Sequence, residues 1–284
     1  MPEDKKDPAD QGTEKKRRLS RRGRLIVVAV VALAVVAAVV VPLVVIFGGK
    51  EPTRSEKLVI PEGYRASQVY EAVDKALAVD DGTTKKAAAN VHFTLPSAAD
   101  GNPEGYLFPA TYPVDKNTTP TSLLAYMNNT ANQRLKADHV TEGSDKNGVS
   151  VYETVVIASI VQAEADTHED MGKVARVIYN RLDQGMPLQM DSTINYALNR
   201  STLDTSHADT RTDSPYNTYA HKGLPPTPIG NPGQDALDAA IAPPKGDWLY
   251  FVTVAPGDTR FTDSYEEQKK NVEEFNSRQA SAKE

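Results

Sequence analysis

Residues 150–164 read Ser-Val-Tyr-Glu-Thr-Val-Val-Ile-Ala-Ser-Ile-Val-Gln-Ala-Glu, and this stretch decides how the second half of the chain folds. Its first four residues match a capping box, in which Ser150 accepts from the amide of Glu153 and the Glu153 carboxylate reaches back to the amide of Ser150. A helix is therefore predicted to begin at Ser150. The capping role already explains Glu153, which makes Glu164 the glutamate of greater chemical interest.

Glu164 shares the apolar face of this helix. The residues on that side are Ile157, Ile160, Val161 and Glu164. Burial disfavours the charged carboxylate, and a place late in the helix lies near the negative end of the helix dipole, so both effects raise its pKa. A carboxylic acid that keeps its proton near neutral pH can protonate a glycosidic oxygen. Periodicity alone favours a plainer alternative, in which Glu164 ends an amphipathic helix and pairs with Arg176 or Arg181.

Outward from this helix, apolar spacing, caps and turn residues predict an α+β arrangement in two parts. Strands are predicted at 57–60, 91–95 and 248–254, with a return at 260–262. Further helices are predicted near 69–77, 121–136, 169–184, 234–241 and 264–279, and the polar stretch 138–149 is predicted to be a loop between the two parts.

The N-terminal region predicts a membrane anchor. The uncharged run Leu25–Phe47 is about 23 residues long, enough for a helix to cross a bilayer core at roughly 1.5 Å per residue. Basic residues crowd the end of 1–24, so the positive-inside rule puts this charged tail, which is predicted to be disordered, in the cytoplasm and the rest outside. A linker at 48–56 would follow. A cleaved signal peptide is the alternative, but its apolar core is shorter and ends at a small-residue cleavage site.

Charge and composition exclude several other functions. Residues 1–24 hold nine Lys and Arg against five Asp and Glu, so the net charge of −6 for the whole chain leaves −10 for the remainder, which argues against a nucleic-acid partner. The chain has no cysteine, and it lacks the serine-hydrolase and penicillin-binding motifs and the paired histidines of a zinc-protease helix. Neither a metal nor another cofactor is expected.

The chain resembles the YceG-like (MltG) family of endolytic peptidoglycan transglycosylases across nearly all of the part after the apolar run. The matching segments are Ile60-Pro-Glu-Gly63, Glu104-Gly-Tyr-Leu-Phe-Pro109, Ala158-Ser-Ile-Val-Gln-Ala-Glu164, Val174-Ala-Arg-Val-Ile-Tyr-Asn-Arg-Leu182, Gly185-Met-Pro-Leu-Gln-Met-Asp-Ser-Thr193, Tyr216-Asn-Thr-Tyr219, Gly223-Leu-Pro-Pro226, Ile229-Gly-Asn-Pro-Gly233 and Tyr250-Phe-Val252.

The resemblance implies a LysM-like subdomain at 57–115 and a YceG-like catalytic domain at 116–284, with Glu164 as the catalytic glutamate. Family members often carry a second Glu two residues earlier and a Thr one residue later, where this chain has Gln162 and Ala165. Gln162 cannot serve as an acid, so Glu164 is the less ambiguous choice.

One carboxyl group suffices for this reaction class, whereas ordinary glycosidases need two. The 6-hydroxyl of N-acetylmuramic acid is the nucleophile, so the bond to N-acetylglucosamine is cut without water and leaves 1,6-anhydro ends. Loop residues expected to hold the sugars are Gln189, Asp191, Thr193, Asn217 and Tyr219. An alternative for two of them is local: Asp191 could cap a helix at Ser192, and Asn217 could bond its own backbone.

Two hypotheses of different class therefore remain. The first is a membrane-anchored lyase that trims or terminates nascent glycan strands outside the cytoplasmic membrane. The second is a non-catalytic scaffold that grips peptidoglycan through the LysM-like part and contacts peptidoglycan synthases. A water-using muramidase is a third reading, and it needs a second carboxylate, for which Asp191 is the candidate.

Overall fold

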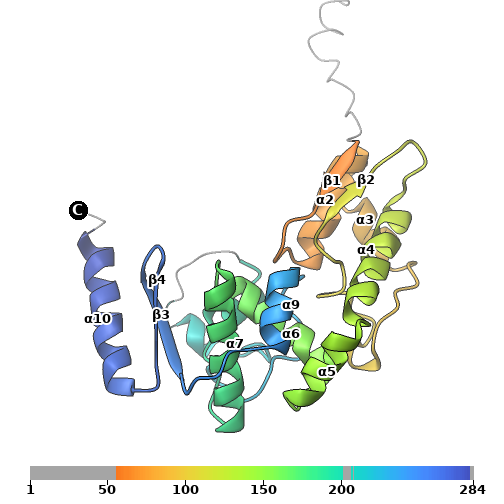
Figure 1. The fold of residues 1–284 in the computed structure, drawn as a ribbon. Coiled ribbons are helices and arrows are strands. Elements are labelled where there is room, and N and C mark those ends of the chain that lie inside the picture. The colour runs from red at the N-terminus through yellow and green to blue at the C-terminus, as the bar shows by residue number, and fades with distance from the viewer. Residues whose placement is uncertain (1–55, 201–205, 207, 282–284) are drawn as a thin grey trace, which may run out of the picture. The chain divides into compact units, whose positions relative to one another are not determined.

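A computed structural model describes residues 56–200, 206 and 208–281 (Figure 1). All of the described residues belong to one compact unit, which spans residues 53–284. The predicted basic tail, the predicted membrane span and nearly all of the predicted linker lie outside the described residues. Within the described ranges, no helix is both long enough and apolar enough to cross a membrane.

The described part of this unit is mainly helical with two small antiparallel sheets, so the prediction of an α+β fold is confirmed in this coarse form. In chain order the elements are β1 (Lys57–Val59), α2 (Ala66–Leu77), α3 (Thr83–Ala88), η1 (Ser97–Ala99), β2 (Thr111–Pro113), α4 (Pro120–Leu135), α5 (Asp138–Lys146), α6 (Val151–Glu164), α7 (His168–Asp183), α8 (Asp191–Ala197), η2 (Asp209–Arg211), α9 (Gln234–Ile241), β3 (Tyr250–Ala255), β4 (Asp258–Thr262) and α10 (Tyr265–Ser281).

The first core is small and forms around the β1–β2 pair. Leu58 of β1 lies opposite Tyr112 of β2 in antiparallel register. One face of α2 packs there through Val69 and Val73, because apolar residues three and four apart share a side of a helix. Three residues of α4 also belong to this core: Leu123, Leu124 and Met127. The first core thus extends past the predicted boundary at residue 115, and the division into a LysM-like subdomain and a catalytic domain stays a prediction.

The predicted strand at 91–95 is wrong, because this segment has no strand pairing. Its backbone is bonded instead by asparagine side chains of α4. The Asn128 side chain accepts from the Thr94 amide at 2.7 Å, and the Asn132 side chain donates to the Thr94 carbonyl at 2.9 Å. Because these side chains bond to both the amide and the carbonyl of Thr94, this residue needs no partner in a sheet.

The predicted loop at 138–149 is also wrong over most of its length, because residues 138–146 form α5. Gly143 lies within this helix, where a glycine costs about 1 kcal/mol relative to alanine. The reason is tertiary: a Cβ at Gly143 would lie 2.6 Å from Cβ of Ile241, so only glycine permits this contact with the end of α9. The packing of α5 against the end of α9 thus outweighs the low helix propensity of Gly143.

The second, larger core surrounds α6 (Figure 1). The Ser150–Glu153 capping box is present as predicted and starts the helix. Eight consecutive residues, from Thr154 to Val161, are buried, so this helix is apolar on all sides and not only along one stripe. Helices α7 and α9 pack along it. The helix is thus the central element of the second core.

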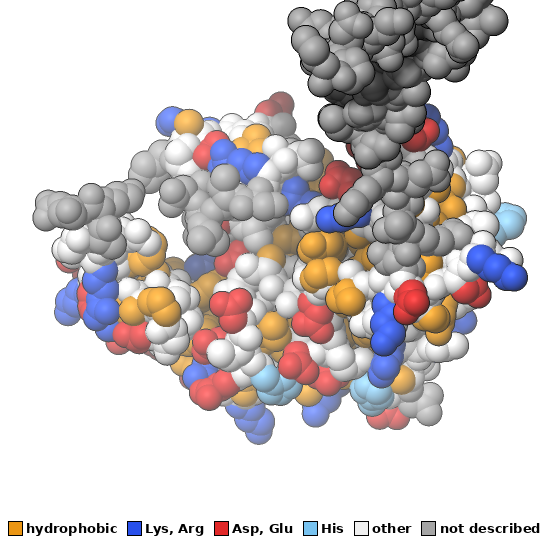
Figure 2. Space-filling view, turned by 90° about the horizontal axis from the view of Figure 1, so that it is seen from above, with side chains coloured by type: hydrophobic (Ala, Val, Ile, Leu, Met, Phe, Trp, Pro, Cys, Tyr) orange, Lys and Arg blue, Asp and Glu red, His pale blue; other side chains and the backbone are white. Residues whose placement is uncertain are grey.

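At the C-terminal end, β3 and β4 form a hairpin that α10 covers (Figure 1). Arg260 of β4 joins them, because it pairs with Asp258 at 3.2 Å and with Glu274 of α10 at 2.7 Å. On the face seen in Figure 2, acidic and basic side chains of the described residues are interspersed. Such a surface differs from the one-sided basic patch typical of nucleic-acid binding.

The two cores meet along a seam, formed by Gly63, Tyr64, Glu104, Leu107 and Asn231. Asn231 is fully buried and bonds to both sides. Its carbonyl accepts from the Gly63 amide at 2.8 Å, its amide donates to the Tyr64 carbonyl at 2.9 Å, and its side-chain oxygen accepts from the Leu107 amide at 2.7 Å. Its side-chain nitrogen donates to the Tyr64 carbonyl at 2.8 Å. A single asparagine therefore satisfies backbone groups of three residues in two separate segments.

Glu104 is the charged member of the seam and is almost completely buried. One carboxylate oxygen accepts from the Ala66 amide, at the start of α2, at 2.9 Å, and from the Asn231 side chain at 3.4 Å. The other accepts from the Tyr196 hydroxyl of α8 at 3.1 Å. Burial outweighs these bonds and raises the pKa of Glu104 to about 7.

The seam is tightly packed at Gly105. This residue has a φ of +83°, and a Cβ built on it would lie 2.6 Å from Cγ of Pro228 and 2.9 Å from Val155. Gly101 has a similar φ of +77° but nothing within 4 Å of such a Cβ. The two glycines share the backbone constraint and differ in the space around them.

Gly105→Ala should therefore destabilise the protein more than Gly101→Ala. Both variants carry the strain of alanine at positive φ, and only the first adds overpacking, which costs about 1–3 kcal/mol. Urea unfolding of the full chain, followed by circular dichroism, measures the difference between the two free energies of unfolding. Equal losses in the two variants would show that the seam relaxes around the added methyl group.

Candidate active site

Glu164 is the last residue of α6, and the sequence predicts that it lies late in this helix. The helix ends because Ala165 is extended, and Thr167 then caps α7, its side chain accepting from the Asp170 amide. The side chain of Glu164 is neither fully exposed nor fully enclosed. The carboxyl group is thus held at the end of a rigid, buried helix.

The surroundings of Glu164 favour its protonated form. Burial raises its pKa, and the neighbouring charge of Asp191 raises it further, whereas the amide and hydroxyl groups of Ser192 lower it. The Ser192 amide donates to Oε1 of Glu164 at 3.2 Å. Burial is the largest of these effects, so the net shift is upward.

The alternative pairing of Glu164 with an arginine of α7 is not the arrangement observed. Arg176 donates to the carbonyls of Pro243 and Pro244. Arg181 is buried and donates to the carbonyls of Leu249 at 2.6 Å and of Leu188 at 2.6 Å. Both guanidinium groups serve to hold loops against α7.

Three of the predicted sugar-binding residues lie in segments that run beside each other. The backbone amide of Gln189 donates to the carbonyl of Thr218 at 3.0 Å, which joins segment 187–190 to segment 216–219. The hydroxyl of Tyr219 donates to Asp191 at 2.6 Å. Burial raises the pKa of Tyr219, and the bond to Asp191 and the charges of Asp191 and Glu164 raise it further, which links the three groups electrostatically. Gln189 is exposed, with a φ of +52°, and its side-chain oxygen lies 3.4 Å from Arg181.

The other two predicted residues are buried. The Thr193 hydroxyl bonds to the Met190 carbonyl at 2.7 Å and pairs with the Thr218 hydroxyl at 2.9 Å. The Asn217 side chain donates to the carbonyls of residues 210 and 212 and accepts from the amides of residues 219 and 220. For Asn217, bonds to nearby backbone groups are the alternative that the sequence predicts to a direct contact with the sugars. Asp191, by contrast, is inside α8 and does not cap it, because the N-cap is Met190.

Sequence reasoning missed two residues of this site. Ser192 supplies the hydrogen bond to Glu164, and Arg181 supports the loop that carries Gln189. Arg181 lies within a segment that carries the family resemblance, and a buried arginine without a carboxylate partner is unusual enough to mark a structural role. No sequence signal points to the Ser192 amide, because any residue except proline supplies one.

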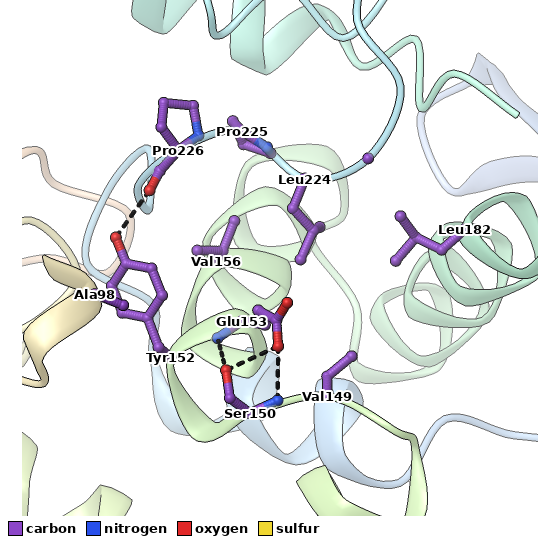
Figure 3. Close-up of a pocket in the computed structure, with 11 residues that line it drawn as sticks. Ala98, Val149, Ser150, Tyr152, Glu153, Val156, Leu182, Leu224, Pro225 and Pro226 are labelled. Carbon is purple, nitrogen blue, oxygen red and sulfur yellow. Dashed lines mark hydrogen bonds between the residues drawn. The ribbon is translucent and has the colours of Figure 1, made fainter. Parts of the chain in front are cut away.

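A separate hollow lies at the other end of α6. Its volume is about 610 Å³, and Figure 3 shows Glu153 and the capping box on one side of it and Leu224, Pro225 and Pro226 on another. The Tyr152 hydroxyl donates to the Pro226 carbonyl at 2.9 Å. None of the predicted site residues lines this hollow, so it is distinct from the surroundings of Glu164.

The chain is similar in sequence to one family and to several named proteins. The model of the YceG-like family matches residues 43–274. A protein of Bacillus subtilis (strain 168) named endolytic murein transglycosylase is 39% identical over 173 residues, covering 61% of this chain and 48% of that protein. One of the same name from Streptococcus pneumoniae serotype 2 is 36% identical over 244 residues, covering 76% of this chain and 44% of that protein.

A solved structure is also similar. The crystal structure of a yceG-like protein from Listeria monocytogenes superposes with a TM-score of 0.64 at 31% identity, covering 75% of this chain and 74% of that chain. The present chain spans less than half the length of the curated relatives that it matches.

The raised pKa of Glu164 can be tested without an activity assay. In isotope-edited infrared titrations of the full chain, the difference between the parent protein and Glu164→Gln isolates one carboxyl group. Its carboxylate band should appear at a higher pH than that of Glu169, obtained in the same way from Glu169→Gln. Burial raises the pKa of Glu164, whereas the ion pair with Lys173 lowers the pKa of Glu169. The reverse order would contradict the described environment.

Proposed function

The chain belongs to the YceG-like family, and from this membership we propose that it is an endolytic murein transglycosylase with Glu164 as its acid and base. The single observation that supports the site assignment is the carboxyl group at the end of buried α6, where burial raises its pKa. A proton held in this way is available for transfer to a glycosidic oxygen.

The proposed reaction needs only this one group. Glu164 donates its proton to the oxygen that links N-acetylmuramic acid to N-acetylglucosamine, and the bond from that oxygen to C1 of the muramic acid breaks. The resulting carboxylate, which the Ser192 amide stabilises, then takes the proton of the muramic acid 6-hydroxyl as O6 bonds to C1. The acid is regenerated, no water is consumed, and the product carries a 1,6-anhydro end.

The residues around Glu164 divide into two proposed roles. Gln189, Asp191 and Tyr219 have side chains that are at least partly exposed, which supports contact with the sugars. Thr193 and Asn217 are buried and bonded to protein groups, which supports a role in shaping the two segments. A sugar contact by either would require one of these bonds to break.

We further propose that the enzyme acts at the outer face of the cytoplasmic membrane, where cleavage would end the growth of nascent strands beside the synthases. The support is the uncharged run Leu25–Phe47 preceded by basic residues. In residues 57–113, β1 and β2 flank α2 and α3 in the sequence, and together with α4 they form a first core apart from the one around α6, which supports a glycan-binding subdomain of the LysM-like kind.

The topology predicts the outcome of proteolysis. Protease added to intact spheroplasts should degrade the part of the chain after Gly48, and the chain should fractionate with membranes. An antibody to the C-terminal helix and a cytoplasmic marker protein report the two compartments. Protection of the C-terminal part in intact spheroplasts would overturn the proposed orientation.

The reaction predicts the mass of the products. Full chain incubated with purified glycan strands should release fragments with 1,6-anhydro ends, each lighter by one water than a hydrolytic product, as mass spectrometry resolves. Glu164→Gln keeps the shape and removes the proton, so it should lower the rate by about 10²-fold or more. Glu153→Gln is the matched control, because glutamine also completes a capping box and residue 153 lies at the far end of the same helix.

The outcomes separate the hypotheses. Hydrated reducing ends would show a muramidase, for which Asp191 beside Glu164 would be the second carboxylate. Full activity of Glu164→Gln would refute the site assignment. No cleavage by the folded parent protein would favour the scaffold hypothesis.

A further inference from the structure

Helix α8 carries two separate contacts that lie one helical turn apart. At its start, the Ser192 amide donates to Glu164 at 3.2 Å. Four residues later, the Tyr196 hydroxyl donates to Glu104 at 3.1 Å. The first contact is made by a backbone amide in the first turn of the helix, and the second by a side chain one turn further on. Glu104 is part of the seam and Glu164 is the candidate acid, so α8 connects the two.

The far end of α8 is held mainly by the first part of the chain. The guanidinium of Arg65 lies over the Tyr196 ring, 5.0 Å from its centre, and donates to the carbonyl of Arg200 at 2.7 Å. The Tyr216 ring packs against the Tyr196 ring, and the two ring centroids lie 4.9 Å apart. Arg65 is the N-cap of α2, and Glu104 binds the first amide of that helix. The N-terminal end of α2 thus contacts both Glu104 and Tyr196.

The start of α8 has an independent attachment. The Thr193 hydroxyl pairs with that of Thr218 at 2.9 Å, and the Met190 amide donates to the Thr218 hydroxyl at 3.0 Å. A helix of two turns needs contacts at both ends to fix its orientation as well as its position. The threonine pair fixes where α8 begins, and the Tyr196 hydroxyl fixes the direction in which it points.

We propose that Tyr196 is a positioning residue for the reaction: through its bond to Glu104 it holds α8 in the orientation that keeps the Ser192 amide on the Glu164 carboxylate. The effect on rate rests on the proposed function, whereas the positioning itself does not. The seam between the two cores thereby acts on the acid without touching substrate.

The proposal predicts a direction for the acid. The charged groups around Glu164 and Glu104 are Asp191 and Arg65, and the tyrosines that face them are Tyr219, Tyr70 and Tyr196 itself. In Tyr196→Phe all of these remain except one hydroxyl group, which does not touch Glu164. Because the Ser192 groups lower the pKa of Glu164, their withdrawal should raise it.

The test is the infrared titration of Glu164 in the full chain carrying Tyr196→Phe. The midpoint should move upward by about half a unit to one unit, part of what the loss of a hydrogen bond to a charged group produces. Tyr216→Phe is the matched control. It also removes one tyrosine hydroxyl from the same ring cluster, but that hydroxyl pairs with Thr227 and does not reach Glu104. In Tyr216→Phe, the titration midpoint of Glu164 should equal that of the parent protein.

Each result decides the proposal. An unchanged midpoint in Tyr196→Phe would show that the threonine pair alone orients α8, and equal shifts in both variants would show general loosening of the aromatic cluster. Either would overturn it. If Tyr196→Phe does not fold, Glu104→Met replaces it: methionine has nearly the length of glutamate and offers the Tyr196 hydroxyl no oxygen acceptor, so the midpoint should again rise.

Kinetics add a second readout. In Tyr196→Phe, kcat should fall several-fold with KM unchanged, because the bond supports the acid and not the bound sugar. An inactive parent protein would refute the proposed function while leaving the titration to decide the role of Tyr196.

Discussion

The hydrogen bonds of one buried asparagine hold the two cores together, and the site depends on that union. Asn231 uses its backbone and its side chain to satisfy the amides of Gly63 and Leu107 and the carbonyl of Tyr64. Backbone groups left unpaired in such a place would each cost about 1–3 kcal/mol. A substitution here therefore removes several hydrogen bonds together.

Around this union, α6 explains why an acid is found where it is. A helix that is apolar on all sides must be enclosed, and its last residue then emerges among the elements that enclose it. Glu164 is that residue, and α8 meets it there. The burial that stabilises the fold is the same burial that keeps the proton on the carboxyl group, so the chemistry follows from the packing.

The sequence predicts best what is decided locally. The start of α6 at Ser150, the helix at 234–241 and the hairpin near 250–262 follow from caps, periodicity and turns within a few residues. Segments 91–95 and 138–146 could not be predicted because their partners, Asn128 and Ile241, lie tens of residues away. The site divides in the same way. Glu164 is visible as an acid in an apolar run, while the Ser192 amide that bonds to it becomes apparent only when the chain is folded.

Two acids also couple this protein to the acidity of its surroundings. Buried Glu104, with a pKa of about 7, and half-buried Glu164, whose pKa is also raised, both hold protons more tightly in the folded chain than in the unfolded one. Folding near neutral pH therefore takes up protons. The stability that Glu104 contributes in this way is complete below its ordinary pKa of 4.5 and is lost as the pH rises towards about 7. Glu169, Asp209 and Glu274 form ion pairs at the surface that lower their pKa values, so they act in the opposite direction, but solvent screens them. The buried acid and the surface ion pairs thus give the fold opposite responses to proton concentration.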